Sequence, residues 1–228
     1  MQPYFFPYLG YFDLICHTDR WVVFDTAQYI RHGWVNRNRI LHPESGWQYV
    51  IAPVRKHARS TPIRDVHVSD DAGWRRRMVG QLMHYRKEAP FFQETIALIE
   101  SCLAIPETSL ARFDVAILDA VCRRLEIPFR REFFSEMALE IGPAEGPGDW
   151  ALGIAAALGA DEYVNPPGGR DLFDPARFEA KGIRLSIREF RNMEYSCGRH
   201  DFVPALSIID ALMWNSCGAV RRYLHEWN

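Results

Sequence analysis

Short β-branched and aromatic runs alternate along this chain with longer segments of helical periodicity. The strand-like runs lie at 20–24 (RWVVF), 47–54 (WQYVIAPV), 63–68 (IRDVHV), 128–134, 162–164 and 183–187 (IRLSI). The helical segments lie at 10–16, 71–86, 90–103, 108–125, 149–158, 175–181 and 203–224, the last split into two helices near Gly218. This alternation predicts an α/β fold, in which a mixed, largely parallel sheet is covered by helices, with a helical elaboration in the middle and at the C-terminus.

The same pattern predicts several local features. The runs 47–54 and 63–68 are expected to pair as neighbours, and Asp149 is expected to cap the helix that follows the turn-rich stretch 142–148 (GPAEGPG). Two prolines crowd four aromatic residues into an extended stretch at 1–8, which must pack against or bind something. Neither an internal repeat nor a low-complexity linker interrupts the 228 residues, so 1–228 is predicted to be a single domain.

The charge balance argues against nucleic acid as the main ligand. The chain carries 27 basic and 29 acidic side chains, for a net charge of -2, and therefore no global field that would attract phosphate backbones. Arginine runs at 75–77, 123–124 and 130–131 have acidic neighbours and are typical of solvated faces. No run approaches the roughly 20 apolar residues that span a bilayer, and the N-terminus lacks a signal-peptide pattern. A cytoplasmic protein without membrane insertion is expected.

The cysteines indicate the same compartment. Their number is odd, they lie far apart, and they form no CxxC pair or Cys/His cluster: Cys16, Cys102, Cys122, Cys197 and Cys217. Reduced thiols fit this pattern best. The eight histidines are scattered singly and form no HExxH pattern, so no metal site is indicated.

Polar groups follow several of the predicted strands. In open α/β sheets ligands bind beyond the carboxyl ends of strands, and Asp25, the stretch 36–39, Ser135 and the stretch 165–170 are expected to converge there. The alternative is that Asp25 and Asn165 only cap turns. Gly168-Gly169 can form a tight turn that presents backbone N–H groups to an anion, but no GxGxxG or GxxxxGK[ST] motif indicates NAD, FAD or ATP.

The stretch 28–40 is interpreted as a functional loop. Asn36-Arg37-Asn38-Arg39 offers two amides and two guanidinium groups, a donor set suited to phosphates, sugar hydroxyls or carboxylates. A nucleotide-sugar diphosphate would suit it, and an exposed loop with unrelated charges is the alternative. His84 is the best general-base candidate among the histidines, although a lone helical histidine is more often structural. No GxSxG or Cys/His signature is present.

Six blocks in order give the chain a resemblance to a known family. They are QPYFFPYLGYFDLI at 2–15, FDTAQYI at 24–30, GWVNRNRI at 33–40, HYRKEAPFF at 84–92, LGADEYVNPPGGRDLFD at 158–174 and FVPALSIIDALMWNS at 202–216. With these blocks the chain resembles the WbqC-like proteins of bacterial O-antigen, surface-polysaccharide and natural-product gene clusters. Two departures stand out: Met1 precedes the Gln-Pro pair where relatives carry a short apolar strand, and Ser196-Cys197 replaces a common glutamine, which makes Cys197 worth testing.

The resemblance and the residue patterns together imply a site. Its proposed catalytic members are Asp25, His84 and Asp210. Its proposed substrate-binding members are Gln2, Tyr4, Gln28, Asn36, Arg37, Asn38, Tyr85, Ser135, Asn165, Gly168, Gly169, Ser207 and Asn215. Ser207 to Asn215 can take part only if their late helix returns to the same sheet edge.

The resemblance implies transfer of an acyl or aminoacyl group from a thioester to the amine of an amino sugar or similar small molecule. Asp25 or His84 would take the amine proton, and Asn36 and Asn38 would face the oxyanion. The donor would be a thioester on coenzyme A or a carrier protein, with no tightly bound cofactor, and a homodimer is compatible with this function. The alternatives are a noncatalytic nucleotide-sugar or glycan-binding protein, with the N-terminal aromatics as a stacking platform, and a glycosyl or nucleotidyl transferase. The last is disfavoured because no DxD or paired-carboxylate set is present.

Overall fold

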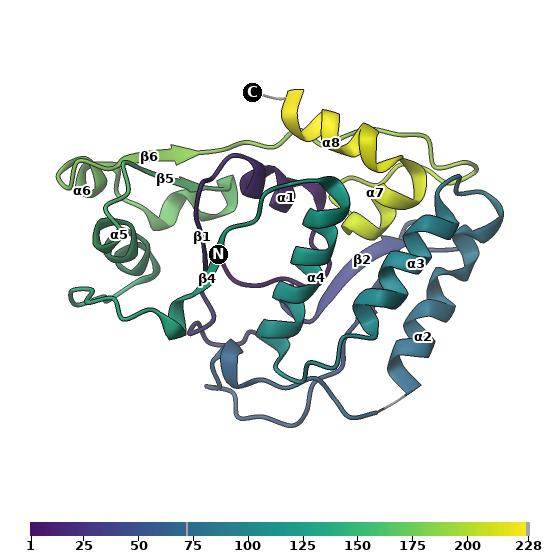
Figure 1. The fold of residues 1–228 in the computed structure, drawn as a ribbon, viewed down its shortest axis with the longest axis horizontal. Coiled ribbons are helices and arrows are strands. Elements are labelled where there is room, and N and C mark those ends of the chain that lie inside the picture. Colours follow the sequence, from purple (N-terminus) through teal and green to yellow (C-terminus); the bar gives the residue numbers. More distant parts are fainter. Residues whose placement is uncertain (72, 227–228) are drawn as a thin grey trace. The chain divides into compact units, whose positions relative to one another are not determined.

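The computed structural model describes residues 1–71 and 73–226 (Figure 1). The chain divides into two compact units, and each is described by itself. The first unit comprises Met1–Ser135 and Asn192–Asn228, and the second unit comprises Glu136–Arg191. The sequence predicts a single domain, and the division into two compact units neither confirms nor contradicts that prediction.

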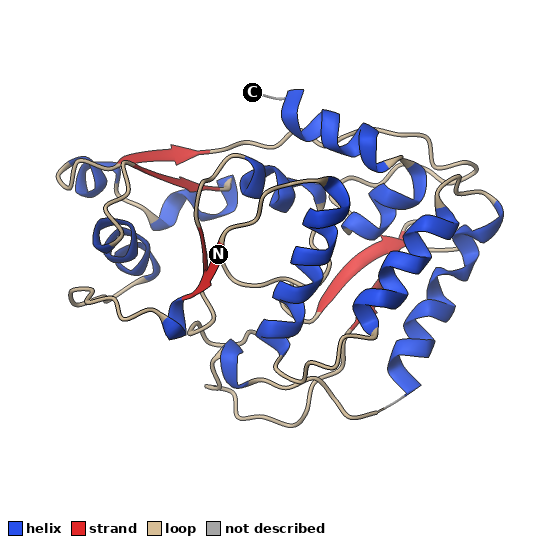
Figure 2. Cartoon of the chain, viewed as in Figure 1, coloured by secondary structure: helices blue, strands red, loops and turns tan. Residues whose placement is uncertain are grey.

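The described residues form three small sheets of two strands each (Figure 2). The pairs are β1 (Trp21–Val23) with β4 (Arg131–Phe133) and β5 (Glu162–Asn165) with β6 (Arg184–Ile187), both parallel, and β2 (Arg37–Leu41) with β3 (Trp47–Ile51), antiparallel. The mixed α/β class with mainly parallel pairing is thereby confirmed.

Helices surround these pairs. The first unit contains α1 (Leu9–Cys16), α2 (Gly73–Leu82), α3 (Phe92–Leu103), α4 (Leu110–Leu125), α7 (Ile208–Trp214) and α8 (Cys217–Glu226), and the second contains α5 (Pro147–Ala157) and α6 (Pro175–Glu179). Short 3₁₀ helices lie at η1 (Ile63–Asp65), η2 (Met83–Lys87), η3 (Phe134–Glu136) and η4 (Pro167–Leu172). In the first unit α3 packs on α4 and α7, and α8 packs on α1 and α4 (Figure 1). None of the helices in the described part of the chain has the length and apolar character that crossing a membrane requires.

The N-terminal aromatic stretch lies in the core of the first unit. Phe5 and Phe6 are 0% and 1% exposed, and the Phe5 ring stacks on Phe113 of α4 with the ring centroids 6.4 Å apart. Burial of each phenylalanine side chain contributes roughly 2 kcal/mol to folding. These two rings are therefore core residues and do not form the stacking platform considered from the sequence.

Two expected features of the first unit differ in the structure. Residues 63–68 form no strand, because β3 pairs with β2 and residues 63–65 are the 3₁₀ helix η1, and the expected pairing with 47–54 is reduced to one antiparallel bridge between Val54 and Val68. The backbone N–H of Ile63 donates to Ala27 O at 2.8 Å and that of Arg64 to Asp25 O at 2.9 Å, so tertiary hydrogen bonds replace a ladder. The expected functional loop 28–40 is likewise a strand in its last part, β2.

The second unit has its own small core. Leu152, Ala155, Phe178 and Ile183 are buried together. Its helix α5 begins at Pro147, two residues before the expected cap Asp149. Asp149 lies in the first turn instead, and its Oδ2 accepts hydrogen bonds from the N–H groups of Glu145 and Gly146, each at 2.9 Å. Proline is well suited to open this helix because its missing N–H would have no partner there.

Candidate functional site

The carboxyl ends of β1 and β4 bring two predicted site residues together. The two strands run in parallel with Val23 opposite Phe133, so Asp25 and Ser135 leave the same end of the pair. Asp25 Oδ1 accepts from the Ser135 backbone N–H at 3.0 Å, and Oδ2 accepts from the Ser135 hydroxyl at 2.5 Å. Asp25 is 2% exposed. Both of its oxygens are thus engaged in holding the turn after β4.

The alternation of β2 separates the amides of the 36–39 stretch from its guanidinium groups. Asn36 and Asn38 are buried, whereas Arg37 and Arg39 are half-buried. The Asn36 amide accepts from the Tyr29 hydroxyl at 2.8 Å and donates to Ala52 O at 2.9 Å. The Asn38 amide donates to Phe5 O at 3.2 Å and Phe6 O at 3.0 Å, which uses both of its N–H bonds. These amides hold the core together and do not face a common oxyanion.

The backbone carbonyl of Phe6 accepts hydrogen bonds from two predicted site residues. Besides Asn38, the Ser207 hydroxyl donates to it at 2.7 Å, and the same hydroxyl caps α7 by accepting from Ile209 N at 3.2 Å. Two residues at this contact have a left-handed backbone: Phe6, with a φ angle of 39°, and Ala205, two residues before Ser207, with a φ angle of 54°. A left-handed backbone costs a non-glycine residue about 1–3 kcal/mol and is enriched at functional sites. Through these bonds the late helix returns to the N-terminal segment. Its return to the sheet edge of Asp25 and Ser135, which the predicted site required, stays a prediction.

The Asp210 carboxylate accepts hydrogen bonds from two tyrosine hydroxyls. Tyr85 donates to its Oδ1 at 2.5 Å and Tyr195 to its Oδ2 at 2.8 Å, while the Leu41 N–H donates to the Tyr85 oxygen at 2.9 Å. Asp210 is 0% exposed. Burial raises the pKa of Asp210 to about 6, against the lowering effect of the tyrosine hydrogen bonds. Burial first, and then the Asp210 charge, raises the pKa of both tyrosines, so their hydroxyls stay protonated donors.

His84 carries a ring nitrogen without a partner. Its Nδ1 lies 2.8 Å from Gln81 O, and because a carbonyl only accepts, Nδ1 bears the proton and Nε2 bears a lone pair. Nε2 is buried and has no hydrogen-bond partner in the described part of the chain. The ring packs on Tyr85 with centroids 4.0 Å apart. Burial lowers the pKa of His84, and the nearby His200 adds to this, so the imidazole is neutral at pH 7.

Cys197 is buried and protonated. Its Sγ lies 3.6 Å from Tyr195 O, and burial, followed by the charge of Asp210, raises the pKa of the thiol to about 12. The reactive form of cysteine is the thiolate. Cys197 is therefore not poised as a nucleophile, although it lies beside the Asp210 group.

Three further predicted residues of the first unit are Gln2, Tyr4 and Gln28. Gln2 O accepts from the Tyr11 hydroxyl at 2.7 Å, and the Tyr4 ring packs on Tyr11 at 5.6 Å between centroids. Gln28 is exposed and donates to Arg59 O at 2.9 Å. These contacts are those of structural residues.

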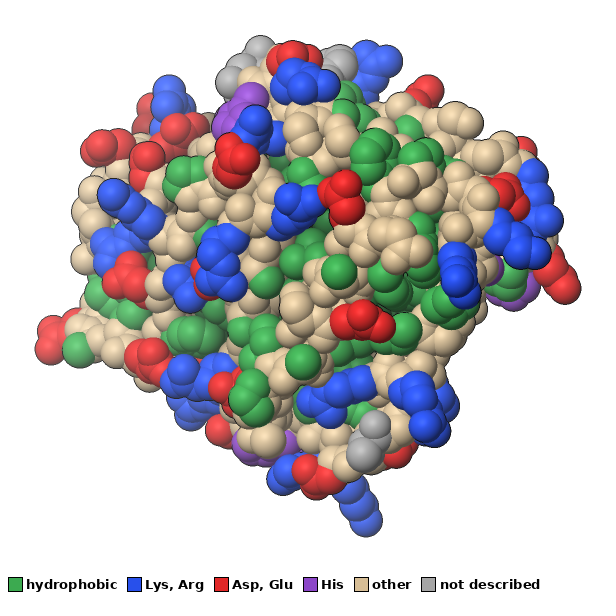
Figure 3. Space-filling model, turned by 45° about the vertical axis from the view of Figure 1, so that its right-hand side comes forward, with side chains coloured by type: hydrophobic (Ala, Val, Ile, Leu, Met, Phe, Trp, Pro, Cys, Tyr) green, Lys and Arg blue, Asp and Glu red, His purple; other side chains and the backbone are tan. Residues whose placement is uncertain are grey.

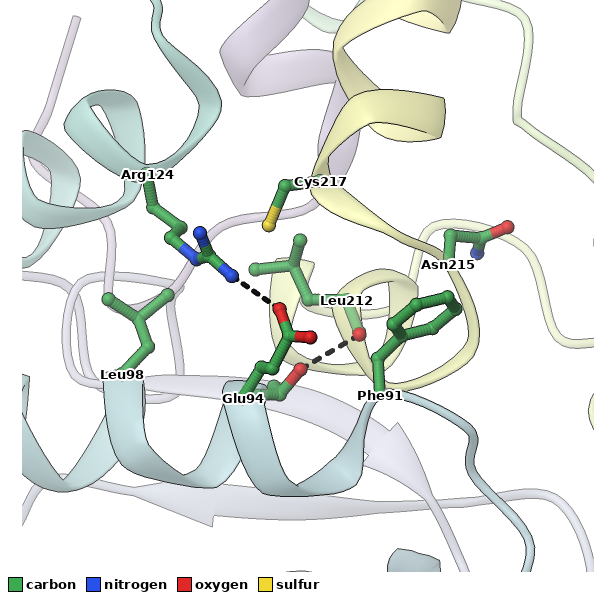
Figure 4. A pocket seen from close by; sticks show the side chains of 8 residues that line it. Phe91, Glu94, Leu98, Arg124, Leu212, Asn215 and Cys217 are labelled. Carbon is green, nitrogen blue, oxygen red and sulfur yellow. Dashed lines mark hydrogen bonds and ion pairs between the residues drawn. The ribbon is translucent and has the colours of Figure 1, made fainter.

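Asn215 lines a shallow depression between α3, α4 and the α7–α8 corner (Figure 4). The Glu94 carboxylate pairs with Arg124 there, and the Thr95 hydroxyl donates to Leu212 O at 2.8 Å. The Asn215 amide is itself bonded to Ala211 O at 2.9 Å. Neither His84 nor Asp210 lines this depression, so it lacks the proposed catalytic residues.

Three predicted residues belong to the second unit. The Asn165 amide donates to Pro166 O at 2.8 Å and closes the turn after β5. A Cβ on Gly169 would come within 2.4 Å of the Asn165 amide nitrogen, whereas a Cβ on Gly168 would meet open space. A side chain at position 169 would therefore displace the Asn165 amide, so the close packing of this turn gives a reason for the glycine without a ligand.

Sequence reasoning missed two polar residues, the half-buried Tyr195 and the buried Asp114. Tyr195 lies in an irregular stretch and has no periodicity that would place it beside Asp210. Asp114 looks like one polar position on an amphipathic helix, yet both of its carboxylate oxygens are buried and lack a partner in the described chain. Burial holds the pKa of Asp114 well above its usual range, so it is a neutral acid. No sequence signal distinguishes it from the exposed acids of the same helix.

Metal ligands do not gather in the described residues. Over 1–71 and 73–226, no three His, Cys, Asp or Glu side chains are arranged to hold a metal ion. His84 Nε2 is a buried proton acceptor without a partner in the described chain, and it lies next to the hydrogen-bonded trio of Asp210, Tyr85 and Tyr195. We refer to these four residues as the His84 cluster.

Comparison with known proteins supports the family indicated by the sequence blocks. The model of the WbqC-like protein family matches residues 2–222. A protein of Mycobacterium tuberculosis, named "Uncharacterized protein Rv1507c", is 29% identical over 215 residues, which cover 93% of this chain and 90% of that protein. No solved structure matches the chain. The match runs through both units and nearly the whole sequence, and the chain belongs to the WbqC-like protein family.

Proposed function

We propose that this protein transfers an acyl or aminoacyl group from a thioester to the amine of an amino sugar or similar small molecule, with His84 as the general base. The observation that carries the proposal is the buried, unpartnered Nε2 of a neutral imidazole. An amine must lose a proton as it attacks a carbonyl carbon, and a neutral histidine at neutral pH is suited to take it.

The reaction balances with the groups named. The amine nitrogen attacks the thioester carbonyl carbon, a C–N bond forms, and the C–S bond breaks. The proton leaves the amine for His84 Nε2 and passes to the departing thiolate, which leaves as a thiol. No redox partner or tightly bound cofactor is needed for these steps.

The surroundings favour His84 over the other candidate bases. Both oxygens of Asp25 already accept hydrogen bonds from Ser135. Both oxygens of Asp210 likewise accept hydrogen bonds, from the hydroxyls of Tyr85 and Tyr195. We therefore assign Asp210 a positioning role: it orients Tyr85, against whose ring His84 packs.

The proposed setting of this reaction rests on the resemblance to WbqC-like proteins. A donor carried by coenzyme A or by a carrier protein is proposed, in bacterial polysaccharide or natural-product assembly. All five cysteines are free, which fits the reducing cytoplasm. A noncatalytic binding protein is the competing proposal, and turnover separates the two.

The test is mass-spectrometric detection of group transfer. The purified protein is offered nucleotide-linked amino sugars together with acyl and aminoacyl thioesters of coenzyme A and of a carrier protein. The proposal predicts that acyl mass appears on the amine and that free thiol is released in equal amount. Binding of a sugar with no transfer from either class of donor would contradict it and favour the binding protein.

A further inference from the structure

The outward face of the β2–β3 hairpin carries alternating arginines and aromatic rings. The Arg39 guanidinium carbon lies 5.4 Å from the centre of the Trp34 ring and 5.1 Å from that of Trp47. The Arg37 guanidinium carbon lies 4.1 Å from the centre of the Tyr49 ring, which packs edge-on against Trp47 at 4.9 Å. Trp34 and Trp47 remain 37% and 42% exposed. We call these five residues the hairpin face.

The arginines of the hairpin face have no acidic partner. Neither Arg37 nor Arg39 has a carboxylate within ion-pair distance in the described part of the chain. Arg37 is anchored by hydrogen bonds to the carbonyls of His32 and Gly33. Two positive charges beside aromatic rings are therefore left without an acidic partner among the described residues.

The Arg39 side chain is held in place by one hydrogen bond and by its packing against two aromatic rings. One of its terminal N–H groups donates to Ala205 O at 3.3 Å, and Ala205 has a left-handed backbone with φ of 54°. Its Nε is buried and has no partner among the described residues. A guanidinium close to two indoles and bonded to Ala205 O has little conformational freedom left to lose. Because Nε is buried, its terminal N–H groups are the donors left for a phosphate.

We propose that the hairpin face binds a nucleoside diphosphate group, with the base stacked on an exposed indole and the phosphates on Arg39 and Arg37. Aromatic rings stack on any base, and planar guanidinium groups match phosphate oxygens. Nucleic acid is disfavoured because the net charge is -2 and basic and acidic side chains are interspersed over the face drawn in Figure 3.

This inference rests on the proposed function and extends it, because it names the chemical group by which one of the substrates is bound. Both proposed substrates contain a nucleoside diphosphate. Nucleotide sugars would be the acceptors, and coenzyme A would carry the acyl group of the donor. The test below measures binding alone, so absence of transfer would overturn the proposed function and leave the hairpin face unaffected.

Isothermal titration calorimetry of the full chain tests the hairpin face. The probes are UDP for the nucleotide-sugar source, free coenzyme A for the donor source, inorganic pyrophosphate for the anion alone and a five-nucleotide single-stranded RNA. The variants are Arg39→Lys, which keeps the charge but loses the fork, and Trp47→Ala, at an exposed position. Arg76→Ala, at an exposed arginine of α2, measures the effect of losing one positive charge outside the face.

Binding of UDP or coenzyme A is expected, and the tighter of the two identifies the source. Arg39→Lys should weaken it by about tenfold because a point charge replaces a bidentate fork. Trp47→Ala should also weaken it, and Arg76→Ala should leave it unchanged. The inference is overturned if neither nucleotide binds, if both variants of the face bind like the wild type, if pyrophosphate binds as tightly as the nucleotides, or if the RNA binds much more tightly.

Discussion

The Asp210 carboxylate lies out of water between two tyrosine hydroxyls, and this makes the stability of the protein depend on pH. Burial raises its pKa in the folded state to about 6, from the ordinary 3.8. Between these values the folded state holds a proton that the unfolded state has lost. The contribution of Asp210 is therefore full below about pH 4, falls as pH rises to about 6 and is constant above it.

Asp210→Asn removes this titration while keeping the shape of the side chain. The free energy of unfolding of the wild type should fall by about 3 kcal/mol more than that of the variant between pH 4 and pH 7. Urea denaturation at several pH values measures the difference. Asp70→Asn, which changes an exposed carboxylate, should keep the wild-type slope. Parallel slopes for the wild type and Asp210→Asn would refute a raised pKa.

The residue patterns of the 36–39 stretch show what a sequence can and cannot predict at this scale. Its donor-rich composition marks it as unusual. The sequence alone favours its interpretation as one set of four donors that face the same ligand. The strand period of two turns Asn38 inward, to the carbonyls of Phe5 and Phe6, and Arg39 outward, to Trp34 and Trp47. The partners of both side chains are distant in sequence, so no local pattern reveals them.

At the scale of elements, α7 is fastened to the N-terminal segment by Ser207. Its hydroxyl caps the helix and also donates to the buried Phe6 O. Ser207→Ala should lower the free energy of unfolding by about 2 kcal/mol or more, because a cap and a buried hydrogen bond are lost together. The measurement is urea denaturation at 25 °C.

Ser109 provides the matched control for this prediction. It caps α4 by accepting from Arg112 N and makes no buried bond of the Ser207 kind. Ser109→Ala should therefore cost about 1 kcal/mol. Equal losses for the two variants would show that the bond to Phe6 contributes nothing.

Helices of strong periodicity are predicted well, and short polar segments are not. The segment 108–125 becomes α4 (Leu110–Leu125), because its apolar spacing and its cap at Ser109 agree. The segment 63–68 alternates like a strand over only a few residues, and the tertiary bonds of Ile63 and Arg64 override that weak signal.

At the scale of the whole molecule, the two compact units differ in how much core they contain. The second unit is built around Leu152, Ala155, Phe178 and Ile183, and the stretch 137–146 that leads into it has little regular structure. Segments with few packed contacts open first. Limited digestion with a glutamate-specific protease should therefore cut first at Glu140 or Glu145.

Intact-mass analysis of the first fragments checks this prediction. A fragment that ends at residue 140 or 145 should appear before any cleavage at Glu94 or Glu100 of α3. First cuts within α3 would contradict the division into units. Sequence alone gave no boundary here, because the chain lacks a compositional linker, and the pairing of β1 with β4 joins segments about 110 residues apart, as in Trp21 with Arg131.

The central claim is that His84 is the base of a transfer reaction, and its pH dependence is the most direct test. The rate constant kcat/KM of the wild type should fall on the acid side with a midpoint below 6.5, because burial lowers the pKa of His84 from that ordinary value. His84→Asn, whose amide can still donate to Gln81 O, should lose about a hundredfold or more and lose this acid limb. If His84→Asn keeps the rate and the acid limb while Asp25→Asn abolishes turnover, the account is wrong.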